Sequence, residues 1–547
     1  MGEGRMGEGI GVRRIGAVLL GLALVVGGCS SDGGDDDARA AEGQVSGGEF
    51  SVAIKEPEHL IPANATSTHA GQVISALFTG LVDYDPETAE PRPAMAESIT
   101  SDDQRTWTVK IKPGWTFHNG EPVTAASYVK AWNFAAYAPN GNENASFFSK
   151  IDGYDALQGD PDATPPVPPS ATEMSGLAVV DDTTFTVRLT DPFSQFPLTL
   201  GFQGYYPAPD AAFADPKAFD EAPVGNGPFM MDGTWRHNEA IRVKRFEGYQ
   251  GPPASAEAVE FRIFTEDGTS LRELQGDTLD VAGVTDQETA SARTEFGDRL
   301  VERDSSAFNY LGFPMSEPAF AKKELRQAIS MAIDRPAIIK AIFEDTKEPA
   351  ASVVSPLVPG SRDDACRACI FDKEGAQKLL ADAGGWKGTL RLSFATGRAA
   401  EEPMEAIANQ LRDNLGITEV QFQPLEFAQL KAKITDRTVG GPFYFNWLMD
   451  YPSPQSYLEP LYTSGSLSNR TGYKNPAVDE LIAEGNKAPS LDESVESYQA
   501  AEDIILDDMP VVPLWFGKTR VVHSDRLERV RIDPFSRVRV QDVKVVG

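Results

Sequence analysis

The sequence predicts an α/β protein in which residues 389–450 form a parallel, doubly wound sheet. Three stretches have the apolar pattern of strands: residues 389–396, 418–425 and 444–450. Two stretches with apolar residues at helical spacing alternate with them: residues 401–416 and 427–435. This β-α-β-α-β order implies parallel strands covered by helices, and such sheets bind ligands beyond the carboxyl ends of their strands.

A second, smaller α+β unit is predicted earlier in the chain. Residues 98–114 and 177–189 each contain a turn beside a stretch in which apolar and polar residues alternate, which is the period of a half-buried strand. A predicted helix, residues 124–136, and a proline-rich loop, residues 161–170, lie between them. Strand pairs with one helix indicate a separate small lobe.

Other helices are predicted from their capping residues. Asp334 is expected to cap the second of two helices within residues 323–343, and Asp372 is expected to cap a helix within residues 371–385. Ser490 begins a capping box before a further helix. These helices are scaffold and carry no functional signal.

The N-terminal residues have the layout of a secretory signal. Arginines precede an apolar run, residues 15–28, that is too short to span a bilayer, so residues 1–28 are expected to be a signal peptide. The run ends at two glycines and Cys29, which resembles the bacterial lipobox, and this resemblance implies that Cys29 is lipidated. An ordinary signal peptide that ends beside a cysteine is the alternative. Residues 29–48 are small, polar and acidic, as in a flexible tether.

The composition indicates a soluble, acidic body that is long enough for two or three domains. Lys and Arg number 50 against 81 Asp and Glu, which gives a formal charge of −31. The sequence has no basic stripe with interleaved aromatic residues. Nucleic acid is therefore excluded as a partner, and the acidic surface favours cationic or zwitterionic ligands.

Cys366 and Cys369 form a CxxC pair. A redox-active pair and half of a zinc site are alternatives, but the sequence supplies neither a thioredoxin-like pattern nor two clear further ligands. In an oxidising compartment, a small loop closed by a disulfide is the expected structure. The five histidines are scattered without metal spacing, so we expect neither a metal nor a cofactor.

The motifs of common enzyme classes are incomplete or absent. A GxGxxG match at residues 2–7 follows no strand, and Gly517-Lys518-Thr519 lacks the first glycine of a phosphate-binding loop. Neither GxSxG nor HExxH occurs. The chain is not expected to be an enzyme, although a secreted hydrolase with an unfamiliar carboxylate pair remains an alternative.

One acidic residue, Asp450, stands in apolar surroundings at the carboxyl end of the third predicted strand. A carboxylate there needs a cationic partner, which is either another residue or a ligand. Arg398 follows the first predicted strand and falls at the same sheet edge, so one site would offer an anion and a cation. The alternatives are a solvated loop charge for Arg398, and a salt bridge or helix cap for Asp450.

Six stretches carry a family resemblance over nearly the whole mature chain: residues 76–99, 106–132, 224–231, 325–339, 449–462 and 472–482. Together they resemble the bacterial solute-binding lipoproteins of ABC importers, family 5, which include the oligopeptide- and dipeptide-binding proteins. The resemblance implies a type II periplasmic-binding-protein fold, with two lobes that close about a hinge and an extra small α+β domain. The implied division is a signal peptide (1–28), a lipidated cysteine with its tether (29–48), lobe I (49–83, 191–300 and 513–547), the extra domain (84–190) and lobe II (301–512).

The resemblance also assigns ligand contacts. In peptide-binding members, the acid of a Trp-x-x-Asp stretch pairs with the α-amino group of the peptide, which gives Asp450 this role and makes Trp447 an apolar wall. Main-chain groups of Thr66, Ser67 and Thr68 are expected to pair with an extended ligand.

Two further contacts follow less directly from the resemblance. Tyr310 lies on a stretch that resembles a site-lining strand and is therefore an expected contact. The turn after this stretch departs from the family pattern, because Pro314 stands where an asparagine is common. No motif fixes the group that binds a ligand carboxylate, and Arg398 is the candidate.

The expected function is a monomeric receptor held by lipid at the outer face of the cytoplasmic membrane. It would bind a short peptide or other small solute and deliver it to ABC permease subunits. The alternatives are the same fold binding an oligosaccharide or a metal chelate, and a lipoprotein that senses or scaffolds without transport.

Overall fold

The computed structural model describes residues 47–160, 163–266, 268–396 and 400–546. Within these ranges, eleven strands form one large mixed sheet, in the order β15-β14-β16-β12-β17-β11-β1-β10-β9-β8 with β13 beside β17. Its strands are β1 (Glu49–Ile54), β8 (Phe229–Met231), β9 (Ala240–Arg245), β10 (Ala258–Ile263), β11 (Val281–Gly283), β12 (Leu300–Gly312), β13 (Glu348–Pro349), β14 (Leu390–Ala395), β15 (Val420–Leu425), β16 (Phe443–Trp447) and β17 (Val511–His523).

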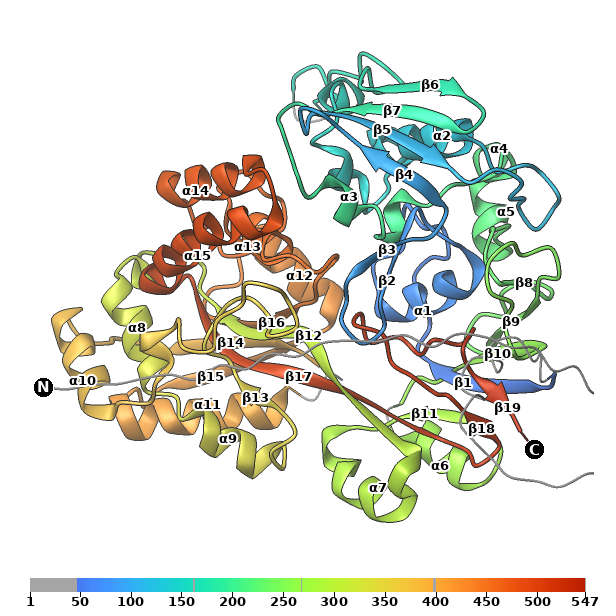
Figure 1. The fold of residues 1–547 in the computed structure, drawn as a ribbon. Helices are drawn as coiled ribbons and strands as arrows, with labels where there is room; N and C mark the ends of the chain where they lie inside the picture. The colour runs from blue at the N-terminus through green and yellow to red at the C-terminus, as the bar shows by residue number, and fades with distance from the viewer. Residues whose placement is uncertain (1–46, 161–162, 267, 397–399, 547) are drawn as a thin grey trace, which may run out of the picture. The chain divides into compact units, whose positions relative to one another are not determined.

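Two long antiparallel strands, β12 and β17, join the two halves of this sheet (Figure 1). At one end of β12, Leu300–Asp304 pair with the part of β17 that also contacts β11. At the other end, Phe308–Gly312 lie between β17 and β16. The ladder is irregular between Asp304 and Phe308. The same two strands therefore run through both halves of the sheet, as expected for the hinge of a type II periplasmic binding fold.

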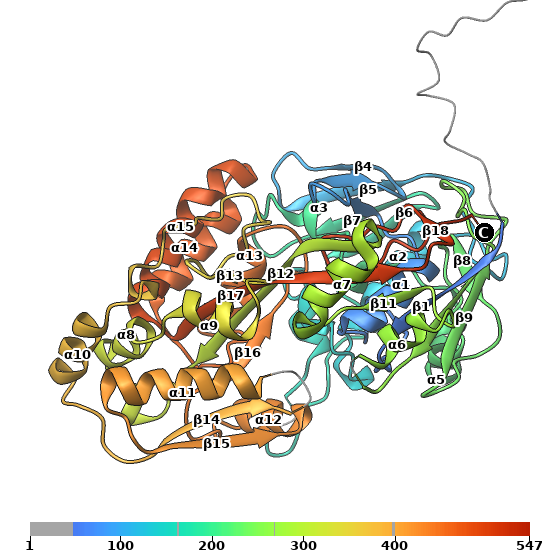
Figure 2. The same cartoon turned by 90° about the horizontal axis from the view of Figure 1, so that it is seen from below.

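The predicted β-α-β-α-β unit is confirmed in lobe II. Strand β14 pairs in parallel with β15 and β16, and α11 (Glu401–Leu415) and α12 (Phe427–Thr435) connect them. Figure 2 shows α11 running alongside β14 and β15. Met404, Ile407 and Leu411 of α11 are fully buried, because their helical spacing turns one apolar face to the sheet.

One predicted boundary was wrong. The third strand was expected to reach residue 450, but β16 ends at Trp447. Pro452 and Pro454 follow closely and have no backbone N–H for a ladder, and the N–H of Asp450 donates to Ser456 Oγ at 2.8 Å. Asp450 therefore lies in the loop after the strand rather than within it.

The predicted small α+β unit is also confirmed as a four-stranded antiparallel sheet of order β4-β5-β7-β6. Its elements are β4 (Ala96–Thr100), β5 (Thr106–Ile111), β6 (Leu177–Asp181), β7 (Thr184–Arg188) and α2 (Ala125–Ala136). Trp132 of α2 packs edge-on against Phe185 of β7, with ring centroids 5.4 Å apart. This contact lies in a hydrophobic core separate from those beneath the large sheet.

The predicted capping residues begin their helices. Asp334, Asp372 and Ser490 each accept a hydrogen bond from the backbone N–H three residues later, at 2.9 to 3.2 Å. They begin α9 (Arg335–Ile342), α10 (Lys373–Asp382) and α15 (Leu491–Asp508).

The helices not yet given bounds are α1 (Thr68–Leu77), α3 (Phe196–Thr199), α4 (Ala211–Ala214), α5 (Pro216–Glu221), α6 (Thr269–Gln275), α7 (Thr289–Phe296), α8 (Lys323–Met331), α13 (Gln455–Tyr462) and α14 (Pro476–Lys487). Four short strands complete the fold: β2 (Val82–Tyr84), β3 (Pro91–Pro93), β18 (Leu527–Glu528) and β19 (Lys544–Val545).

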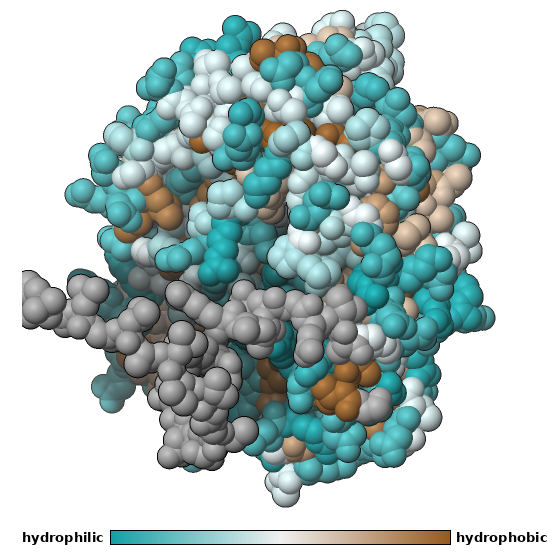
Figure 3. Space-filling view, turned by 45° about the vertical axis from the view of Figure 1, so that its right-hand side comes forward, coloured by the Kyte–Doolittle hydropathy of each residue, from teal (hydrophilic) through white to brown (hydrophobic). Residues whose placement is uncertain are grey.

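In the described part of the chain, no helix has the length and apolar character needed to cross a membrane. Cys366 and Cys369 are joined by a disulfide, with their Cα atoms 5.3 Å apart. The face in Figure 3 is mostly polar, with apolar side chains in small separate patches.

Candidate functional site

The loop that carries Asp450 is held in place by the first turn of α13 and by β12. The indole N–H of Trp447 donates to the carbonyl of Ser456 at 2.8 Å. The Tyr457 hydroxyl donates to the carbonyl of Ser306 at 2.7 Å, and the N–H of Met449 donates to Ser306 Oγ at 3.4 Å. Trp447 and Asp450 are therefore fixed by neighbours on two other elements.

The Asp450 carboxylate is half-buried and has no cationic partner among the described residues, since no Lys, Arg or His nitrogen there lies within 4.0 Å of it. Burial raises the pKa of Asp450 to about 7. Both facts describe an anion that has lost much of its hydration without gaining an ion pair. A cationic group of a bound ligand would supply the ion pair that the Asp450 carboxylate lacks within the described residues.

Four tyrosines lie within the electrostatic reach of Asp450. Burial is the main cause that raises the pKa of Tyr84, Tyr205, Tyr451 and Tyr457, and the Asp450 charge adds to it. Tyr451 and Tyr457 belong to the segment that follows β16, whereas Tyr84 ends β2 and Tyr205 precedes α4. Tyr84 and Tyr451 also share a small apolar cluster with Leu198. Asp450 thus lies where lobe II meets the rest of the protein.

Polar contacts near Asp450 join lobe II to the rest of the protein. Gln195 donates from Nε2 to the Tyr498 hydroxyl at 2.6 Å and accepts a hydrogen bond from Ser453 Oγ. Lys150 and Glu459 form an ion pair of 2.6 Å. The lobes are therefore in contact beside Asp450 in this structure.

The segment expected to pair with an extended ligand is bound to the chain itself. The backbone N–H groups of Thr66 and Ser67 each donate to Glu58 Oε1 at 2.6 Å, and the Ser67 hydroxyl caps α1. Glu58 therefore occupies two of the expected main-chain donors, and a ligand would have to displace it to use them. Thr68 is the first residue of α1.

The structure does not place the two remaining predicted contacts, Tyr310 and Arg398, among the residues around Asp450. Tyr310 is 1% exposed, and its ring stacks on Phe308 at 5.3 Å in the core of lobe II. This position offers a ligand no surface, so Tyr310 is better explained as a core residue. Arg398, like Cys29, lies outside the described residues.

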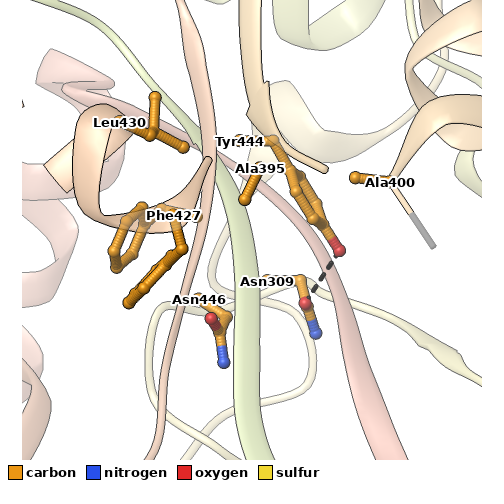
Figure 4. Close-up of a pocket in the computed structure, with 8 residues that line it drawn as sticks. Asn309, Ala395, Ala400, Phe427, Leu430, Tyr444 and Asn446 are labelled. Atoms are coloured by element: carbon orange, nitrogen blue, oxygen red, sulfur yellow. Dashed lines mark hydrogen bonds between the residues drawn. The ribbon is translucent and has the colours of Figure 1, made fainter. Parts of the chain in front are cut away.

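A cavity that the sequence did not predict lies beside β16, with a volume of about 180 Å³ (Figure 4). Eight residues line it: Asn309, Ala395, Ala400, Phe427, Leu430, Tyr444, Phe445 and Asn446. The sequence feature that could have indicated this cavity is the spacing of Tyr444 and Asn446 along the strand, which places two polar side chains on one face.

Within the described ranges, no group of His, Cys, Asp or Glu is arranged to hold a metal ion.

Comparisons with known proteins agree with this geometry. Residues 90–469 match the family described as bacterial extracellular solute-binding proteins, family 5 Middle. The oligopeptide-binding protein OppA of Bacillus subtilis is 26% identical over 94% of this chain and 95% of that protein. The dipeptide-binding protein DppE of the same species is 25% identical, over 91% and 92% of the two chains. The structure of the Escherichia coli murein tripeptide binding protein MppA superposes with a TM-score of 0.80 at 22% identity, covering 93% of this chain and 99% of that one.

Proposed function

Because the chain belongs to family 5 of the bacterial extracellular solute-binding proteins, we propose that it is a receptor that binds short peptides and delivers them to an ABC importer. The names of its relatives OppA and DppE describe peptide-binding proteins, and these relatives match it over more than nine tenths of its length. The receptor makes and breaks no covalent bond in its solute. It acts outside the cytoplasm.

The observation that carries the proposal is the Asp450 carboxylate, half-buried between the lobes without a cation in the described part of the chain. The α-ammonium group of a peptide is a cation that every unblocked peptide provides. A charge-assisted hydrogen bond from this group to Asp450 would fix where the peptide begins. Trp447 would form an apolar wall beside it.

The edge of β16 supports main-chain pairing with the ligand. In the described residues, β14 and β16 pair only at Ser393 and Phe443, so the same edge of β16 is unpaired further on, toward Trp447. An extended peptide could add to this edge through its backbone, which gives affinity without a strong sequence preference.

Ligand binding would be coupled to closure about β12 and β17. A ligand shifts a hinge equilibrium only as far as it contacts the closed form better than the open form. A peptide that contacts Asp450 and β16 of lobe II, and tyrosines from the other side, favours the closed form. The permease would then receive a protein whose shape reports that it is loaded.

The N-terminal part of the proposal concerns location. Residues 1–28 would direct export, Cys29 would carry the lipid, and residues 29–48 would tether a monomeric body to the outer face of the cytoplasmic membrane. The division into lobe I, extra domain and lobe II predicted from the sequence belongs to the same proposal.

Native mass spectrometry tests the proposed ligand class. A soluble form that begins after Cys29 is purified gently from cells and then denatured to release its guest. A ladder of short peptides is the expected result. A single non-peptide mass, such as an oligosaccharide or a metal chelate, would keep the family and remove the role given to Asp450. If the protein is recovered empty, calorimetry with a defined peptide pool replaces the first measurement.

A further inference from the structure

The cavity beside β16 contains a side-chain amide that makes no hydrogen bond to the described residues. Asn446 is half-buried, and neither its side-chain donor nor its acceptor makes a hydrogen bond within the described part of the chain. Figure 4 shows Asn446 next to Asn309, on the neighbouring strand β12. An amide in a partly enclosed space is a ready partner for a group that both donates and accepts.

The other polar groups of the cavity are already engaged. The Tyr444 hydroxyl donates to Asn309 Oδ1 at 2.9 Å, and Asn309 Nδ2 lies 3.3 Å from the carbonyls of Ala307 and Trp515. These bonds hold Asn309 and Tyr444 in place. Among the polar side chains that line the cavity, the Asn446 amide is therefore the one that can still form hydrogen bonds to a bound group.

The eight lining residues offer a charged guest group no ion pair. None of the eight lining residues carries a charge, and apolar side chains including Phe427 and Leu430 form much of the surface. An ionised group would lose hydration here without an ion pair among the lining residues. A purely apolar group would leave the Asn446 amide unsatisfied, which is also unfavourable.

The size and position of the cavity fit one part of the proposed ligand. A volume of about 180 Å³ is smaller than the roughly 300 to 1,000 Å³ of sites that hold a whole small molecule. Asn446 precedes Asp450 by four residues, which span at most about 14 Å when extended. A peptide with its α-ammonium group at Asp450 therefore reaches the cavity within its first five residues.

We propose that this cavity is a subsite for a carboxamide side chain of the bound peptide, which is uncharged and both donates and accepts hydrogen bonds. This inference rests on the proposed function, since it needs a peptide at Asp450. It makes Asn446 a specificity-determining residue.

The test uses alanine pentapeptides in which one position, from the second to the fifth, carries glutamine or the similarly sized methionine. Calorimetry on the mature protein measures each pair, with pentaalanine as the reference. At one position, glutamine is expected to bind about 2- to 10-fold more tightly than methionine, the effect of one net hydrogen bond. Asn446→Leu should reduce this ratio to about one. Asn409→Leu, on the exposed side of α11, should keep it.

Each other outcome has a definite meaning. If methionine binds as well as glutamine at every position while pentaalanine binds, the subsite is wrong and the proposed function stands. If no peptide binds, both are wrong. The comparison in the unsubstituted protein decides the case even where Asn446→Leu does not fold.

Discussion

Lys150 Nζ lies 2.6 Å from Glu459 Oε1, and this ion pair joins the small α+β unit to lobe II beside the proposed ligand site. The second oxygen of Glu459 accepts hydrogen bonds from Asn486 Nδ2, at 2.9 Å, and from Gln455. Gln455 in turn accepts a hydrogen bond from Tyr451, the neighbour of Asp450. Burial acts to raise the pKa of Glu459, but Lys150 and these donors outweigh it and lower the pKa. The contact between the lobes is thus linked by hydrogen bonds to the segment that carries Asp450.

Lys150→Met should favour separation of the lobes. It leaves Glu459 without a cation at a position where its side chain is only 28% exposed. The loss should be about 1 to 2 kcal/mol of closed-state stability, between the values of exposed and buried pairs. Because a smaller closed fraction weakens apparent affinity in proportion, peptide binding should fall by about 5- to 30-fold. Calorimetry measures the affinity, and small-angle scattering of the empty variant should show a larger radius of gyration.

Lys487→Met is the matched control for this prediction. Its pair with Asp191 is 3.2 Å long, but the two side chains are 50% and 65% exposed. Water and salt screen such a pair, so the affinity should change by less than about threefold. Equal effects of the two variants would show that Lys150 acts through general charge rather than as a contact between the lobes.

Asp450→Asn should weaken peptide binding by about 1.5 to 3 kcal/mol, the range for a hydrogen bond to a charged group. The change keeps the size of the side chain and removes its charge. N-acetylated peptides provide the matched control, because they lack the ammonium group and should lose little affinity on the same substitution. Unchanged calorimetric affinity for unblocked peptides, in a folded variant, would remove Asp450 from the site.

The sequence was sufficient where the structure depends on local interactions. Asp334, Asp372 and Ser490 bond to backbone groups three residues away, so capping patterns located the starts of their helices. Strand and helix periods likewise predicted that β14, β15 and β16 belong to one parallel sheet.

The sequence was insufficient where the structure depends on distant partners. The end of β16 is set partly by the bond from Asp450 N–H to Ser456, which no period encodes. The cavity joins Tyr444 to Asn309, which are 135 residues apart in the chain. Asp450 could be singled out only because an acid among apolar residues is unusual in itself. The lack of a cationic partner for Asp450 among the described residues is a tertiary property.

Arg335→Lys should destabilise the fold strongly, although it keeps the charge. Arg335 is 1% exposed, burial lowers its pKa to about 9, and its donors reach four carbonyl oxygens and one hydroxyl group. These acceptors include Pro513 on β17, at 2.6 Å, and Cys369 in the disulfide loop, at 2.8 Å. A lysine has three donors on one atom and cannot reach them all, so the free energy of unfolding should fall by at least about 3 kcal/mol.

Urea denaturation measures this loss, with Arg531→Lys at an exposed position as the control. The control should change the free energy of unfolding by no more than about 0.5 kcal/mol. If Arg335→Lys is as stable as the control, the guanidinium fork is not what holds β17 to the disulfide loop.

The stability of the empty protein should depend on pH through Asp450. Its pKa is raised from 3.8 to about 7 in the folded state, so the folded protein holds this proton more tightly than the unfolded chain. The stabilising contribution is therefore complete below about pH 4 and is lost as the pH rises to about 7. The difference in thermal midpoint between the native protein and Asp450→Asn isolates this group. Relative to the native protein, the variant should be more stable at pH 8 than at pH 4.

Peptide affinity should depend on pH with the opposite sign. The α-ammonium group needs the ionised form of Asp450, but below about pH 7 the carboxyl group of the empty protein is mainly neutral. Binding must then expel a proton, so affinity should fall by up to about tenfold for each pH unit below 7. Calorimetry in two buffers of different ionisation enthalpy should detect the released proton at pH 6. In Asp450→Asn both the pH dependence and the proton release should disappear. A variant that retains them would show that another group titrates, and the ion pair between Asp450 and the ligand would lose its support.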